Sequence, residues 1–113
     1  MDNLENKAGL VQRQDDSRGI VDINHLWGIF KIINRLGLHG RPAAKFVKIA
    51  SKYDCDVAIK KVGESREVSG KSILGLMTLE LAYGSEMQVQ VSGNDDSGKC
   101  LEDLKYLVAS GFL

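Results

Sequence analysis

Three residues within four positions of this chain could do chemistry together. His39, Arg41 and Pro42 stand in the stretch 37–44, GLHGRPAA. Proline is well tolerated in the first turn of a helix, because the N–H group that it lacks would have no intrahelical partner there. The stretch therefore predicts a helix that begins at Arg41 or Pro42, with His39 at or beside the residue that caps it.

This placement predicts an anion site at His39. Free N–H groups and the positive end of the helix dipole converge at a helix N-terminus. A neutral imidazole nitrogen is a nucleophile, and a phosphoryl group placed on it would be held by the helix end and by Arg41. Gly40 would let the backbone approach the phosphoryl oxygens, while Pro42 and Ala43 set the helix start. A histidine before a helix can also be a simple surface or capping residue, so residue types alone leave both interpretations open.

The stretch 37–44 resembles the active-site motif of the HPr family, the histidine-containing phosphocarriers of the bacterial phosphotransferase system. The resemblance implies that His39 accepts a phosphoryl group on Nδ1 from Enzyme I and passes it to an EIIA-type domain. It also implies a monomeric covalent carrier rather than an enzyme with turnover, with no cofactor and no metal. Because His39 is present, the chain is not one of the regulatory homologues that have lost the phosphorylatable histidine.

A second motif, KSILGLMTL at 71–79, resembles the second signature of the same family. In many bacteria the serine of this signature is phosphorylated by an ATP-dependent HPr kinase. The resemblance thus implies that Ser72 is a regulatory phosphosite, in organisms that have the kinase. By itself, Ser72 is a good N-cap residue for the helix that follows it.

A docking surface for protein partners is expected beside His39. The helix after Pro42 places lysines on a face of their own, and the helix after Ser72 is apolar nearly all round, so part of it should stay exposed. A basic stripe beside an apolar patch would suit acidic partners, although a solvated helix face explains the lysines equally well. The residues expected at this surface are Lys45, Lys48, Ile73, Leu74 and Met77.

Length and composition limit the classes of protein to which this chain could belong. The chain has 113 residues and a formal net charge of zero, which favours one domain and argues against non-specific nucleic-acid binding. Cys55 and Cys100 match no metal-ligand spacing, so we expect two reduced structural thiols. No apolar run reaches the ~18 residues of a membrane span. We therefore expect a soluble, cytoplasmic protein.

The first 24 residues differ from the rest in composition. They contain acidic residues, a few basic ones and sparse apolar residues without a strict period. We expect a polar, flexible extension over 1–24 and one domain over 25–113.

The pattern of apolar residues predicts seven elements in the domain. Strands are expected at 27–34, 57–60, 66–69 and 87–91, and helices at 42–52, 72–83 and 99–110. This order favours an α+β open-faced β-sandwich, a four-stranded antiparallel sheet with three helices on one face. It is the βαββαβα arrangement of the HPr family.

Two questions stay open from the sequence: the class of protein and, within the HPr family, the branch. The stretch 37–40 fits the G-x-x-G loop of a KH-type RNA-binding module, although a predicted strand precedes it and the net charge is zero. Within the HPr family, the branch is open. Leu36 and the end of the chain, Ser110 to Phe112, resemble the nitrogen-branch carriers, which serve regulation without sugar transport. The stretch 71–79 instead resembles the kinase-regulated sugar-type carriers.

Overall fold

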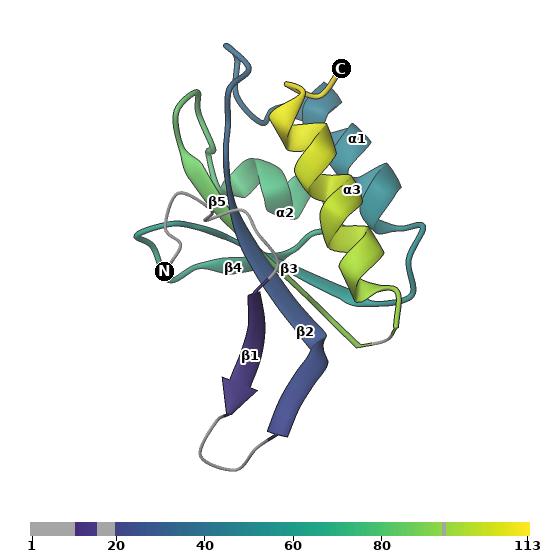
Figure 1. Cartoon of the computed structure of the whole chain (residues 1–113). Coiled ribbons are helices and arrows are strands. Elements are labelled where there is room, and N and C mark those ends of the chain that lie inside the picture. The colour runs from purple at the N-terminus through teal and green to yellow at the C-terminus, as the bar shows by residue number, and fades with distance from the viewer. Residues whose placement is uncertain (1–10, 16–19, 94) are drawn as a thin grey trace.

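The structure is a computed structural model of the whole chain and describes residues 11–15, 20–93 and 95–113. Its elements are shown in Figure 1. They are β1 (Val11–Asp15), β2 (Ile20–Lys31), α1 (Gly40–Ala50), β3 (Asp56–Lys61), β4 (Glu67–Ser69), α2 (Ile73–Thr78), β5 (Glu86–Ser92) and α3 (Ser97–Ala109).

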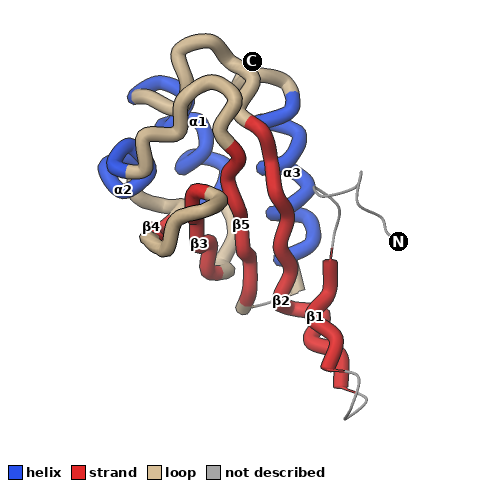
Figure 2. The backbone as a smooth tube through the Cα atoms, turned by 90° about the vertical axis from the view of Figure 1, so that its left-hand side faces the viewer, coloured by secondary structure: helices blue, strands red, loops and turns tan. Residues whose placement is uncertain are grey.

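The strands form one antiparallel sheet in the order β1-β2-β5-β3-β4, and the helices lie on one of its faces (Figures 1 and 2). The strands β2, β5, β3 and β4 with the three helices make the predicted open-faced sandwich. Along β5, Met87, Val89 and Val91 are buried while the residues between them are only half-buried. This period of two places one row of side chains against the helices, as predicted for a half-buried strand. Phe46 of α1, Leu76 of α2 and Leu104 of α3 are fully buried in the same core.

The segment 1–24 contains strands that the sequence did not predict. β1 pairs with the first part of β2, so β2 begins at Ile20 rather than at residue 27. The β-branched residues Ile20, Val21 and Ile23 favour strand, although they show no strict period of two. The remaining residues of the segment, 1–10 and 16–19, lie outside the described residues. A flexible extension over 1–24 and a domain boundary at 25 stay predictions.

Helix α2 is shorter than predicted. It ends at Thr78, whereas the apolar pattern predicted a helix up to residue 83. The chain leaves the helix through Glu80, whose φ of 52° is left-handed. This turn lets Leu79 and Leu81 both enter the core, which one face of a continuous helix would not allow. Gly84, which follows the predicted helix, lies beyond this turn. Its N–H donates to the carbonyl of Ile32 at 2.8 Å, in the turn that leads into β5.

The two cysteines are free and buried. Burial raises the pKa of the Cys100 thiol to about 12, and the neighbouring Cys55 adds to the rise. Both residues therefore behave as core side chains, as predicted. Within the described ranges, no helix is long and apolar enough to cross a membrane.

Candidate functional site

His39 is the N-cap residue of α1, as the sequence predicted. Its backbone is extended, with φ −102° and ψ −159°, and its carbonyl accepts the Ala43 N–H at 2.8 Å. The side chain makes no capping hydrogen bond and is exposed to solvent. The imidazole is therefore accessible, as a nucleophile for a protein-borne group must be.

The start of α1 offers hydrogen-bond donors to an anion. Helix α1 begins at Gly40, and no partner accepts the N–H of Gly40 or Arg41 among the residues that the structure describes. Pro42 has no N–H, and its buried ring, with the buried Ala43, anchors the first turn in the core. The Arg41 side chain is exposed, and a Cβ atom added to Gly40 would meet nothing within 4 Å. The first turn of α1 therefore offers two N–H groups and an exposed arginine next to His39 in the chain, with open space at Gly40.

The loop before His39 is held by two hydrogen bonds that the sequence did not predict, one between backbone groups and one from a side chain. The Leu38 N–H donates to the Leu81 carbonyl at 2.8 Å, and Asn34 Nδ2 donates to the Gly37 carbonyl at 2.6 Å. Gly37 has a φ of 77°, and a Cβ atom there would lie 2.7 Å from the Leu81 oxygen. The glycine before the histidine motif was the available signal for this close approach, since only glycine tolerates both conditions.

A hollow of about 260 Å³ lies beside His39. It joins the loop before α1 to the C-terminal end of α2 and the segment that follows α2. The residues that line it are Leu36, Leu38, His39, Met77, Glu80, Leu81 and Ala82. Met77 was predicted to contact partners, whereas Glu80 was not identified from the sequence.

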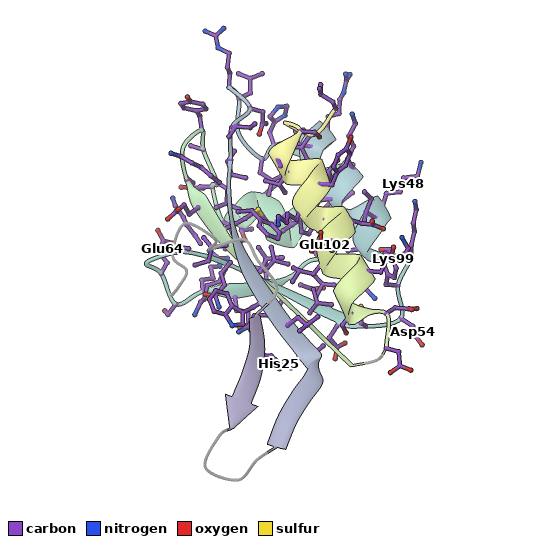
Figure 3. The ribbon with its side chains drawn as sticks, viewed as in Figure 1. His25, Lys48, Asp54, Glu64, Lys99 and Glu102 are labelled. Atoms are coloured by element: carbon purple, nitrogen blue, oxygen red, sulfur yellow. The ribbon has the colours of Figure 1, made fainter. Side chains whose placement is uncertain are left out.

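The other predicted docking residues lie on α1 and α2, which pack against each other. Ile73, Leu74 and Met77 are 40%, 77% and 41% exposed, which is unusual for apolar side chains. Lys48 projects outward from α1 in Figure 3 and is exposed. Lys45 differs, because its Nζ donates to the Phe112 carbonyl at 2.8 Å and so ties α1 to the C-terminal segment.

Ser72 is the N-cap residue of α2, as predicted. Its Oγ accepts the Gly75 N–H at 2.9 Å, and the side chain is half-buried. Lys71, just before it, donates from Nζ to the Tyr53 carbonyl at 2.8 Å. The start of α2 is thus fastened to the segment that follows α1. Among the described residues, no group of three or more His, Cys, Asp or Glu side chains could hold a metal ion.

The fold and the site define a class of small open-faced β-sandwich proteins in which an exposed histidine occupies the N-cap position of a helix. The family model for the PTS HPr component phosphorylation site matches residues 28–110. The phosphocarrier protein HPr of Pseudomonas aeruginosa is 40% identical over 81 residues, which cover 72% of this chain and 88% of that protein.

Solved structures agree with this match. HPr-C-His from Thermoanaerobacter tengcongensis superposes with a TM-score of 0.70 at 35% identity, over 76% of this chain and 93% of that one. HPr from Bacillus anthracis superposes with a TM-score of 0.68 at 33% identity, over 74% of this chain and 96% of that one. The chain belongs to the HPr family, the phosphocarriers of the phosphotransferase system. This membership excludes the KH-type module as its fold.

Proposed function

We propose that this chain carries a phosphoryl group on His39, accepting it from Enzyme I and passing it to an EIIA-type domain. The observation that carries the proposal is the start of α1. There an exposed imidazole is followed by two N–H groups that have no partner within the described part of the chain, and by the exposed side chain of Arg41. Family membership supports a phosphocarrier of the phosphotransferase system.

The transfer step uses the unprotonated Nδ1 of His39. A nitrogen–phosphorus bond forms as the bond between phosphorus and the donor atom of Enzyme I breaks, and the bonding electron pair leaves with the donor. The N–H groups of Gly40 and Arg41, with the guanidinium, stabilise the negative oxygens of the bound group. On the EIIA-type domain the same bond breaks, so the chain acts as a stoichiometric carrier without turnover of its own.

Partners would dock over the surface formed by α1 and α2. Lys48 and Arg41 supply positive charge, and the exposed residues Ile73, Leu74 and Met77 supply apolar area. Lys45 contributes less, because its ammonium is already bonded to Phe112. An acidic partner with an apolar centre fits this surface.

The test is phosphorylation by phosphoenolpyruvate and Enzyme I. Wild-type protein should gain an acid-labile, base-stable group on His39, and His39→Ala should gain none. The matched control is His25→Ala, because His25 is the other histidine of the chain and lies on β2 (Figure 3). Labelling of His39→Ala, or loss of labelling in His25→Ala, would refute the assignment.

We also propose that Ser72 is a regulatory phosphosite for an HPr kinase. Phosphate on Oγ would add about −1.5 to −2 charges beside the exposed residues Ile73 and Leu74. Repulsion of an acidic partner would then slow transfer through His39. Ser72→Asp should lower the rate from Enzyme I strongly at low salt and weakly at high salt. Equal rates for Ser72→Asp and wild type at low salt would leave Ser72 as a helix cap.

A nitrogen-branch carrier without sugar transport is the alternative. Leu36 favours it, because this residue is 80% exposed and lines the hollow beside His39. An apolar side chain there would select a different acceptor from the one that a polar side chain selects. Competition between a sugar-type and a nitrogen-type EIIA domain for the phosphorylated chain decides between the branches.

A further inference from the structure

The hollow beside His39 contains one carboxylate, that of Glu80. Glu80 is exposed, and its carboxylate has no hydrogen bond or ion pair with any residue in the described part of the chain. Lys61 comes close, but its Nζ donates to the Glu80 main-chain carbonyl at 3.3 Å. The negative charge is therefore available to a partner.

The backbone at Glu80 is unfavourable for a residue with a side chain. Among the described non-glycine residues, only Glu80 and Phe112 have a positive φ, of 52° and 66°. Phe112 is buried, so packing explains its conformation, whereas Glu80 makes no such contact with the core. The turn itself serves the burial of the flanking residues Leu79 and Leu81, but glycine would make the same turn without strain, so a glutamate at this position points to a functional use of its side chain.

Apart from Glu80 and His39, the described lining of the hollow is apolar. Its apolar residues are Leu36, Leu38, Met77, Leu81 and Ala82. A lysine or arginine side chain matches such a site, since its methylene stem packs on apolar surface while its charged head bonds a carboxylate. The volume of about 260 Å³ is large enough for either side chain.

We propose that this hollow receives a lysine or arginine side chain of the phosphoryl donor, Enzyme I, with the charged head on Glu80. The inference rests on the proposed function. The donor is chosen over the acceptor because every phosphorylated chain must meet it, whichever acceptor follows. The docking surface then carries both positive and negative charge. Acidic groups of the donor meet Arg41 and Lys48, and one cationic group of the donor meets Glu80. That cation would lie beside His39 and stabilise the charge on the phosphoryl group in transit.

The test is the initial rate of phosphorylation by Enzyme I and phosphoenolpyruvate, measured against the concentration of this chain. Glu80→Gln should raise KM about fivefold at low salt, and the increase should shrink at high salt. Glu80→Lys should raise KM further. Glu80→Gly should match Glu80→Gln, because glycine keeps the left-handed backbone and removes only the side chain. Glu102→Gln is the matched control, an exposed glutamate on α3 that does not line the hollow, and it should leave KM unchanged (Figure 3).

The direction of the change in KM decides whether the proposal holds. If Glu80 only repels an acidic donor, Glu80→Gln lowers KM, and the proposal is wrong. An unchanged KM, or a change seen only in transfer to the EIIA-type domain, also overturns it. The final extent of labelling on His39 separates this inference from the proposed function. Full labelling with an unaltered KM in Glu80→Gln refutes only the inference, whereas no labelling of wild-type His39 refutes the proposed function.

Discussion

Helices α1 and α2 begin in opposite ways. At α2, Ser72 uses its own hydroxyl to accept the Gly75 N–H at 2.9 Å, which closes the first turn. At α1, His39 occupies the same N-cap position but makes no capping bond, so the N–H groups of the first turn stay open. A capped start gains stability, and an uncapped start keeps its donors for an anion.

The uncapped start of α1 is stabilised by other contacts. The preceding loop is bonded to the segment after α2, through the Leu38 N–H and the Leu81 carbonyl. Pro42 and Ala43 are buried beneath the first turn. Packing and backbone hydrogen bonds thus replace the missing cap and leave the N–H groups at the surface. A helix end that must bind and release a charged group can be fixed in this way without blocking its donors.

Changing Gly37 should break the α1 start most severely. Gly37→Ala puts a Cβ atom 2.7 Å from the Leu81 oxygen at a φ of 77°, so both strain and a clash with backbone follow. We expect the free energy of unfolding to fall by about 2 kcal/mol or more. Urea unfolding measures it. Gly63→Ala is the control for conformation alone, since Gly63 has a φ of 95° but nothing within 4 Å. Equal losses in the two variants would show that the close approach to Leu81 is unimportant.

Removing the cap of α2 should have a smaller effect. Ser72→Ala loses the bond to the Gly75 N–H, and we expect a loss of about 1 kcal/mol in the free energy of unfolding. Phosphoryl transfer to His39 should be unchanged in this variant, because no charge is added. His39→Ala should leave stability nearly intact, since the His39 side chain caps nothing. A larger loss of stability in His39→Ala than in Ser72→Ala would reverse the comparison of the two helix starts.

Replacing Arg41 tests the role of positive charge at the start of α1 without disturbing the fold. Its side chain is exposed, so Arg41→Ala should change the free energy of unfolding by only about 0.5 kcal/mol. The rate of phosphoryl transfer should nevertheless fall about tenfold, because a charge-assisted contact to the phosphoryl group is lost. Lys52→Ala, a change of an exposed lysine just beyond α1, is the matched control and should keep the wild-type rate. An unaltered rate in Arg41→Ala would remove this residue from the mechanism.

The last expected effect depends on pH and is absent near neutral pH. The hydrogen bond to Asp103 raises the pKa of Tyr53 from 10.0 to about 12, and burial raises that of Cys100 from 9.0 to about 12. Both groups lose protons more readily in the unfolded chain than in the folded one. Their contribution to the free energy of unfolding is therefore present below about pH 9 and is lost as the pH rises towards 12. Urea midpoints between pH 8 and pH 11.5 should fall, and should fall less in Tyr53→Phe. An identical decline of the urea midpoint in Tyr53→Phe would show that Tyr53 does not contribute to the pH dependence of stability. Neither group lies in α1 or α2, so the starts of these two helices can be compared at pH 8 without this effect.

The sequence by itself determined the features that depend on near neighbours. Proline at the third position of α1 and glycine two residues before His39 set a helix start, so His39 was correctly expected at the N-cap. Ser72 was likewise predicted as a cap, and the alternation along 87–91 predicted the buried face of β5. Capping and strand alternation arise within a few residues, where the chain's own geometry leaves few choices.

Only the tertiary structure decided which distant groups meet. The apolar run after Ser72 predicted a long helix, but Leu79 and Leu81 both reach the core only if the helix ends early, and this turn brings Glu80 to the hollow beside His39. The bond from Lys45 to Phe112 joins residues 67 positions apart in the sequence. Such contacts depend on how the helices pack on the curved sheet, and a local pattern of apolar residues does not specify that packing.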